Sequence, residues 1–174
     1  MAQSPHLAAI RLLLTDVDGV WTDGRLHFDH SGRELKSFHV HDAAGLAYWH
    51  RAGGLSGFLS GRAAPIVAAR AQELGVHEVH LGNLAKLPVF EELTRRLGLA
   101  DGEVAYVGDD LLDLPVLRRV GFAVAPADAR PEVRRAVHHV TAAAGGCGVV
   151  REVVELLLRA RGAWDGVVDR GGMP

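Results

Sequence analysis

The sequence has very little cysteine and very little lysine. Cys147 is the only cysteine among the 174 residues, so we expect neither an intrachain disulfide nor a thiolate metal cluster. Lys36 and Lys86 are the only lysines, and every other strongly basic residue is an arginine. The position of each lysine is therefore easy to notice.

The sequence also lacks an excess of charge and a long apolar run. A formal net charge of −2 gives no overall attraction to nucleic acid or to an acidic membrane surface. No apolar run approaches the length that crosses a bilayer, and residues 1–9 lack the pattern of a secretory signal. We therefore expect a cytoplasmic enzyme or binding protein that uses neither nucleic acid nor a membrane as its partner.

What is present is an alternation of strand-like and helix-like segments. With 48% hydrophobic and 23% charged residues, residues 1–174 are predicted to form one domain with a substantial core. The alternation predicts an α/β fold, a Rossmann-like parallel sheet with helices on both faces. The predicted strands are 10–15, 55–59, 76–81, 104–107 and 122–124, with 138–140 at an edge. The predicted helices are 42–51, with Asp42 as N-cap, 63–74, 85–97, 111–120, 131–137 and 149–161; a tail of about 162–174 follows.

An insertion follows the first strand, at about residues 25–40. Leu26 and Phe28 alternate with polar neighbours, residues 30–32 supply a turn, and Leu35 and Phe38 continue the pattern. This pattern predicts a β-hairpin. Because a solitary hairpin is only marginally stable in water, we expect it to pack on the domain or on another subunit.

Two carboxylates end the first strand. Asp16 and Asp18, followed by Gly19, are expected at the mouth of the sheet, where open α/β folds bind ligands. With Mg²⁺ between them, one carboxylate can act as nucleophile and the other as proton donor. For this stretch alone, an Asp-rich turn of no functional importance is an equally good interpretation.

Two further strand ends are predicted to meet the same crevice. Ser60 is placed to donate to a phosphate oxygen, and also to cap the next helix. Lys86 begins a helix, where a cation is disfavoured, so it is expected to have an anionic partner such as a substrate phosphate. Asp109 can complete an oxygen-ligated Mg²⁺ site. Of Asp110 and Asp113, one is expected to serve only as a helix-start carboxylate.

These residues carry a resemblance. Asp16-x-Asp18-Gly-Val-x-Thr-Asp-Gly, Ser60, Lys86 and Gly108-Asp109-Asp110-x-x-Asp113 match in order the four motifs of the haloacid dehalogenase superfamily. The chain resembles most closely its small, capless phosphatases of 3-deoxy-D-manno-octulosonate 8-phosphate (KDO 8-phosphate). Supporting segments, over residues 10–161, are Gly32-x-Glu34-Leu35-Lys36-x-Phe38, residues 104–110 and 125–129, and Gly145-Gly146-x-Gly148-x-Val150-Arg151-Glu152.

The resemblance implies a role for each matching residue. Asp16 would be the nucleophile that forms an aspartyl-phosphate, and Asp18 the general acid and then base. Mg²⁺ would be held by Asp16, the backbone carbonyl of Asp18, and Asp109, with Asp113 and Asp110 in support. The phosphate and the substrate would be bound by Ser60, Gly61, Arg62, Lys86, His41 and Arg151. The implied activity is phosphomonoester hydrolysis in lipopolysaccharide biosynthesis.

The resemblance also implies an assembly, and this sequence departs from the family's pattern at two positions. Members are homotetramers whose hairpins form a central barrel, with the C-terminal tail of one subunit closing a neighbour's active site, and they lack a cap domain. Two positions where the family often has arginine are His41 and Cys147 here. Neither residue replaces the bidentate fork of an arginine, so the sequence leaves open which sugar acid is the substrate.

Two alternative functions remain. One is hydrolysis of a phosphorylated nine-carbon acid, such as N-acylneuraminate 9-phosphate or its deaminated analogue, and the other is that of a non-catalytic domain that drives assembly. The intact motif carboxylates argue against the second of these. Histidine pairs (His39 with His41, His138 with His139) suggest a transition-metal site but lack a third ligand. Residues 145–148 are interpreted as a mobile hinge of the tail rather than as a phosphate loop.

Overall fold

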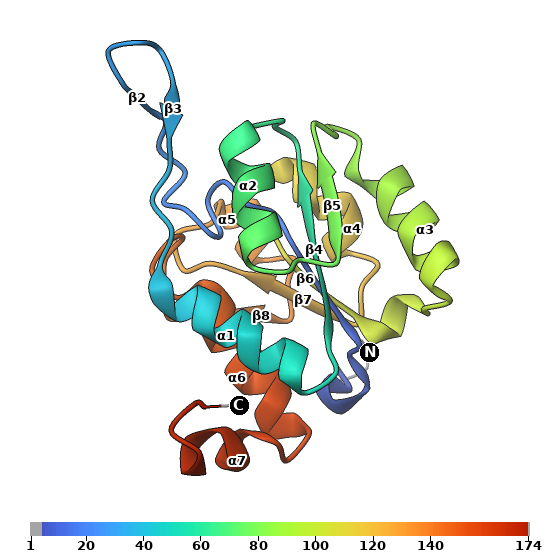
Figure 1. The fold of residues 1–174 in the computed structure, drawn as a ribbon. Helices are drawn as coiled ribbons and strands as arrows, with labels where there is room; N and C mark the ends of the chain where they lie inside the picture. Colours follow the sequence, from blue (N-terminus) through green and yellow to red (C-terminus); the bar gives the residue numbers. More distant parts are fainter. Residues whose placement is uncertain (1–4, 174) are drawn as a thin grey trace.

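The computed structural model describes residues 5–173 and contains a six-stranded parallel sheet (Figure 1). The strand order is β5-β4-β1-β6-β7-β8, and every neighbouring pair is parallel. The strands are β1 (Leu12–Thr15), β4 (Leu55–Ser60), β5 (Glu78–Leu81), β6 (Val104–Val107), β7 (Phe122–Ala125) and β8 (His139–Val140). The predicted parallel α/β sheet is therefore confirmed, with β8 at one edge.

Helices cover both faces of this sheet. One apolar cluster joins the sheet to α1 (Val40–Arg51), α2 (Pro65–Glu73), α6 (Val149–Ala160) and α7 (Trp164–Asp169). The other joins it to α3 (Lys86–Leu97), α4 (Leu114–Leu117) and α5 (Pro131–Arg134). In β1, Leu13 belongs to the first cluster while Leu12 and Leu14 belong to the second, because successive side chains of a strand point to opposite faces.

The insertion after β1 forms the predicted hairpin. Strands β2 (His27–Phe28) and β3 (Glu34–Leu35) pair antiparallel, with Phe28 opposite Glu34. Figure 1 shows this hairpin extending away from the body, at the opposite end of the molecule from α7. Its apolar side chains Leu26, Phe28 and Leu35 are exposed in the single chain.

The structure corrects two predicted helix caps and one strand. Helix α1 begins at Val40, and His39, not Asp42, caps it by accepting a hydrogen bond from the His41 amide. His39 and His41 therefore lie at a helix start and not on one face of a strand. Helix α2 begins at Pro65 after Ala64. Since proline at the first helical position sets this start, Ser60 lies four residues before the N-cap position and does not cap the helix.

Asp42 has a different role. Its side chain is fully buried, and its Oδ1 accepts a hydrogen bond of 2.8 Å from the amide of Arg151 at the start of α6. Asp42 thus links the first turn of α1 to the N-terminus of α6, where a carboxylate is favoured. No helix within residues 5–173 is both long enough and apolar enough to cross a membrane.

Candidate active site

A polar cleft lies where the carboxyl ends of β1, β4 and β6 meet. It has a volume of about 250 Å³. Most of the residues that the sequence predicts for the catalytic centre line it, namely Asp16, Asp18, Ser60, Gly61, Arg62, Lys86, Asp109 and Asp110. Gly24, Leu84 and Leu112 complete the lining. The predicted convergence of three strand ends is confirmed, because parallel strands place their carboxyl ends at one edge.

Lys86 is the centre of the buried part of this cleft. Its Nζ lies 2.8 Å from Asp16 Oδ2 and 2.6 Å from Asp113 Oδ1. Its side chain is 1% exposed, and that of Asp113 is fully buried. A buried charge requires a partner, so these two carboxylates explain how a cation is accommodated at the start of α3. The anionic partner expected for Lys86 is thus provided by the protein itself.

Asp113 holds the loop after β6. Its Oδ2 accepts hydrogen bonds from the amides of Asp109 (3.0 Å) and Asp110 (3.1 Å). Its Oδ1 accepts one from the hydroxyl of Tyr106, at 2.6 Å. Asp110 instead caps the following turn through the Leu111 amide. Asp110 is therefore the helix-start carboxylate of the pair, and Asp113 supports Lys86 and the orientation of Asp109.

The electrostatics of the cleft favour a bound cation. Burial, together with the Asp113 carboxylate, raises the pKa of Asp16 to about 6, against the opposing effect of Lys86. Burial and the neighbouring Asp113 and Asp16 carboxylates raise the pKa of Asp109 to about 8. Burial opposes the charge of Lys86, but Asp16 and Asp113 outweigh it and raise the pKa of Lys86. Buried carboxylates that lie close together behave in this way, because burial and each neighbouring negative charge oppose ionisation.

The donor atoms fit a hard divalent cation. Asp16, Asp109 and Asp113 each offer a carboxylate oxygen within 4.8 Å of the others. Asp109 Oδ1 is buried and has no hydrogen-bond partner among the described residues. Since the oxygens of Asp113 already bind Lys86, Tyr106 and two amides, Asp16 and Asp109 are the carboxylates left for a metal. An all-oxygen set of this kind suits Mg²⁺.

Gly19 provides the space beside these carboxylates. Its φ is +85°, and a Cβ atom at this position would lie 2.5 Å from Asp109 Cγ. Only glycine combines this conformation with such a close approach to the carboxylate. Steric crowding beside Asp109 therefore explains why a glycine follows Asp18 in this motif.

Asp18 belongs to a second charged network at the mouth of the cleft. Lys36, from the hairpin, contacts Asp18 Oδ1 through its Nζ, which lies 2.9 Å from Glu34 Oε1. Arg62 Nη2 donates to both oxygens of Glu34 at 3.1 Å. The sequence predicted Arg62 here but not Lys36, Glu34 or Tyr106. Two signals pointed to Lys36: the rarity of lysine, and its place in the segment Gly32-x-Glu34-Leu35-Lys36-x-Phe38, which also contains Glu34.

Three residues singled out in the sequence lie away from this cleft. His41 is exposed at the start of α1, and Cys147 is exposed in the loop before α6. The guanidinium of Arg151 lies 5.0 Å from the ring centres of both Tyr48 and Trp164. The loop that contains Cys147 is held in place by two hydrogen bonds. The Gly145 amide donates to Asp128 Oδ1, and the Gly146 amide donates to the Val20 carbonyl.

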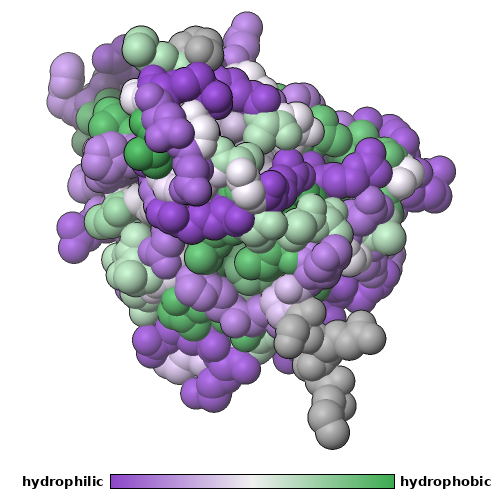
Figure 2. All heavy atoms as spheres, turned by 90° about the horizontal axis from the view of Figure 1, so that it is seen from below, coloured by the Kyte–Doolittle hydropathy of each residue, from purple (hydrophilic) through white to green (hydrophobic). Residues whose placement is uncertain are grey.

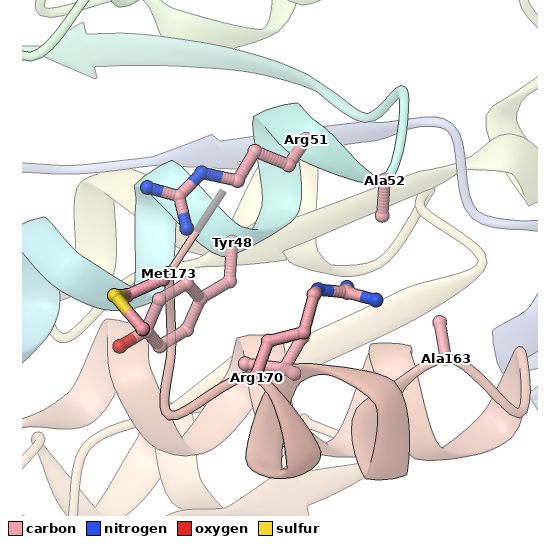
Figure 3. Close-up of a pocket in the computed structure, with 7 residues that line it drawn as sticks. Tyr48, Arg51, Ala52, Ala163, Arg170 and Met173 are labelled. Carbon is pink, nitrogen blue, oxygen red and sulfur yellow. The ribbon is translucent and has the colours of Figure 1, made fainter.

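A second hollow lies at the opposite end of the molecule and is not a comparable site. It is lined by Tyr48, Arg51, Ala52, Ala163, Val167, Arg170 and Met173 (Figure 3), and none of these described residues has a carboxylate side chain. Arg51 Nη1 donates to the Gly172 carbonyl there at 2.6 Å. Figure 2 shows this end of the molecule, where polar residues surround smaller apolar areas.

Comparisons with known proteins agree with this geometry. The family model described as haloacid dehalogenase-like hydrolase matches residues 62–153. The 3-deoxy-D-manno-octulosonate 8-phosphate phosphatase KdsC of Salmonella typhimurium is 43% identical over 166 residues, which are 93% of this chain and 88% of the relative.

Solved structures of such phosphatases superpose closely. The Moraxella catarrhalis enzyme, in complex with a magnesium ion, a phosphate ion and KDO, gives a TM-score of 0.93 at 34% identity and covers 95% of each chain. A cobalt-bound deoxy-D-mannose-octulosonate 8-phosphate phosphatase from Haemophilus influenzae gives a TM-score of 0.90 at 40% identity, and the match covers 96% of this chain and 98% of the other.

The fold and the paired aspartates with their lysine thus define a haloacid dehalogenase-like hydrolase. Within that class, the chain belongs to the family of the 3-deoxy-D-manno-octulosonate 8-phosphate phosphatases.

Proposed function

We propose that this protein is a Mg²⁺-dependent phosphomonoesterase that hydrolyses KDO 8-phosphate to KDO and phosphate. The observation that carries the proposal is the buried contact of Lys86 with Asp16 at 2.8 Å, in a cleft that Asp18 and Asp109 also line. The relatives named above, one of them with magnesium, phosphate and KDO bound, support the choice of substrate and metal.

Asp16 is the nucleophile. Its Oδ1 accepts a hydrogen bond of 2.6 Å from the Val17 amide, and Oδ2 faces Lys86, so the side chain is held in one orientation. A carboxylate oxygen of Asp16 attacks phosphorus, the bond from phosphorus to the sugar oxygen breaks, and Asp18 gives that oxygen its proton. Water then attacks the aspartyl-phosphate, Asp18 takes a proton from it, and Asp16 and phosphate are released.

Lys86 and the loop after β4 hold the transferring group. The Lys86 ammonium offsets charge on the phosphoryl oxygens, and the hydroxyl of Ser60 and the amide of Gly61 bind them at the strand end. Arg62, 41% exposed at the mouth of the cleft, is placed for the sugar acid.

Asp16 and Asp109, with the backbone carbonyl of Asp18, would hold Mg²⁺. When bound, the metal neutralises charge on the phosphoryl group and keeps Asp16 ionised. Asp109 has a raised pKa, and its Oδ1 has no hydrogen-bond partner among the described residues. A bound metal would lower this pKa and supply that oxygen with a partner, because ligands bind metal in their deprotonated form.

The working enzyme is a cytoplasmic homotetramer with shared active sites, acting in lipopolysaccharide biosynthesis. The exposed apolar residues of the hairpin, Leu26, Phe28 and Leu35, support an assembly through that element. His41 and Arg151, which lie outside the cleft of their own chain, are then available to a neighbouring site.

The test is phosphate release, with and without Mg²⁺, from KDO 8-phosphate, N-acylneuraminate 9-phosphate and ordinary sugar phosphates. A strong Mg²⁺-dependent preference for KDO 8-phosphate is expected. Preference for another phosphate would keep the chemistry and replace the substrate. Turnover of none of them would favour the non-catalytic assembly domain.

A further inference from the structure

We propose that Lys36 of the hairpin is a positioning residue for Asp18, holding one carboxylate oxygen so that the other is free to exchange a proton with the substrate. The inference rests on the proposed phosphatase function, in which Asp18 is the proton donor. It gives the hairpin a part in its own chain's active site, through Lys36 just beyond β3.

Lys36 is well fixed. Its side chain is 1% exposed, and its Nζ contacts both Asp18 Oδ1 and Glu34 Oε1. Glu34 in turn receives Arg62 Nη2 on both of its oxygens. The contacts run from Asp18 to Lys36, then to Glu34, and then to Arg62, with negative and positive charges alternating. Each charged group therefore has a neighbour of opposite charge.

The two oxygens of Asp18 have different surroundings. Oδ1 is paired with Lys36, whereas Oδ2 is buried and has no hydrogen-bond partner among the described residues. The Arg62 Nε, 3.9 Å away, is beyond hydrogen-bond distance of Oδ2. A buried polar atom without a partner is costly in a folded protein. Asp18 lines the cleft, and the leaving oxygen of a bound substrate is the partner that would complete Oδ2.

The choice of lysine fits this division. A lysine ammonium is a compact point charge that can hold a single oxygen, whereas an arginine fork binds both oxygens of a carboxylate. In a chain that otherwise uses arginine, the only two lysines each contact one of the two motif aspartates: Lys86 pairs with Asp16 and Lys36 with Asp18.

The test compares two leaving groups. The sugar oxygen of KDO 8-phosphate needs a proton as its bond to phosphorus breaks, whereas 4-nitrophenolate leaves 4-nitrophenyl phosphate without one. In Lys36→Met, kcat/KM for KDO 8-phosphate is expected to fall by roughly 10- to 100-fold, which is part of the roughly 100- to 10,000-fold that general acid catalysis typically contributes. For 4-nitrophenyl phosphate we expect a fall of less than about threefold, since that leaving group needs no acid. The ratio kcat/KM depends only on the steps up to departure of the leaving group. The later hydrolysis of the aspartyl-phosphate therefore does not affect this comparison.

Two further variants link the effect to Asp18. Asp18→Asn is expected to show the same selective loss, and adding Lys36→Met to it is expected to change little, because both changes remove one function. Lys36→Arg is expected not to restore the wild-type rate on KDO 8-phosphate. Arg33→Met, an exposed cation on the same hairpin that pairs with Asp29, is the matched control and is expected to keep both activities.

An equal loss on both substrates in Lys36→Met would show that Lys36 only maintains the fold, and would overturn the inference. Full activity of Lys36→Arg would overturn the single-oxygen argument. Lys36→Gln, which keeps a polar side chain, replaces Lys36→Met if thermal unfolding shows that the methionine variant is not folded. A wild-type protein that hydrolyses 4-nitrophenyl phosphate but not KDO 8-phosphate would instead contradict the proposed substrate, and one inactive on both would contradict the proposed function.

Discussion

Asp16 and Asp18 are two residues apart, yet their surroundings differ in a way that separates their roles. Asp16 faces the buried Lys86 and shares it with Asp113, whereas Asp18 lies nearer the mouth of the cleft beside Lys36 and Arg62. A nucleophile needs to be ionised and oriented, and a proton donor needs one free oxygen. At the residue scale, each aspartate contacts one lysine, and these contacts fit the roles proposed for Asp16 and Asp18.

Asp16→Asn removes the proposed nucleophile while keeping the shape of the side chain. Turnover of KDO 8-phosphate is expected to fall at least about 1,000-fold, as when other covalent nucleophiles are removed, with fold and assembly unchanged. Steady-state phosphate release measures the effect. Asp169→Asn, at an exposed carboxylate in α7, is the control. Retained Mg²⁺-dependent turnover in Asp16→Asn would refute the assignment.

Gly19→Ala tests the space beside Asp109. The new Cβ would lie 2.5 Å from Asp109 Cγ, so the carboxylate must move and Mg²⁺ affinity is expected to fall at least about tenfold. Isothermal titration with Mg²⁺ measures it. Gly32→Ala, at φ +80° with no atom within 4 Å, has the same backbone strain without the clash. Equal Mg²⁺ affinity in both variants would show that Gly19 has no part in the metal site.

At the scale of elements, the first turn of α1 is fastened to the start of α6. Asp42 accepts a hydrogen bond from the Arg151 amide, and a Cβ on Gly45 would lie 3.0 Å from Arg151 Cα. The two helices are therefore in close contact along this turn. The loop that leads into α6 is bonded to the loop after β1 through Gly146, so this junction also supports the backbone beside the cleft.

Burial of Asp42 makes stability depend on pH. Burial raises the pKa of Asp42 above its usual value of 3.8, so the folded protein binds this proton more tightly than the unfolded chain. The resulting stabilisation is fully present below pH 3.8 and is lost as the pH rises through the folded pKa. Asp42→Asn lacks this dependence. Its melting temperature relative to wild type is therefore expected to rise between pH 4 and pH 7.

The measurement is thermal unfolding of both proteins across that pH range in the presence of a chelator. Titrations of the cleft carboxylates are common to both proteins and cancel in the difference. Asp165→Asn, at an exposed carboxylate, is the control and is expected to follow wild type. A difference between Asp42→Asn and wild type that does not change with pH would contradict the role of burial.

At the scale of the whole molecule, the hairpin has exposed apolar side chains and also reaches the mouth of the cleft, through Glu34 and Lys36. Phe28 is 60% exposed and Leu35 51% exposed, although an isolated hairpin gains little stability in water. The same hairpin leads into Lys36 at the cleft. Assembly and catalysis are therefore expected to be coupled through this one element.

Replacing Phe28 and Leu35 together by serine is expected to shift the proposed tetramer to smaller species, because apolar contacts of this kind drive association. Light scattering measures the mass, and phosphate release from KDO 8-phosphate is expected to fall with it. Val79→Ser, an exposed apolar position on β5, is the control. A wild-type protein that is a stable monomer would contradict the shared-site assembly.

Much of the fold follows from local sequence alone. Apolar runs that alternate with helical patterns specify a parallel sheet, and β6 occupies the predicted residues 104–107, because strand and helix periods are local properties of the chain. The convergence of Asp16, Ser60 and Asp109 followed from that topology, whereas Lys86 was inferred from the cost of a cation at a helix start. The hairpin at about 25–40 followed from its alternation and turn.

Contacts between distant residues were decided only by the tertiary structure. The sequence placed Asp42 as a cap of its own helix, whereas packing of α1 on α6 brings it to the start of the other one. It gave no sign that Tyr106 would bond to Asp113, or that Lys36 would reach Asp18. Patterns of residues fix which segments form strands and helices. The partner of a buried charge depends on how those segments pack, because the charge takes whichever opposite group the packing brings within reach.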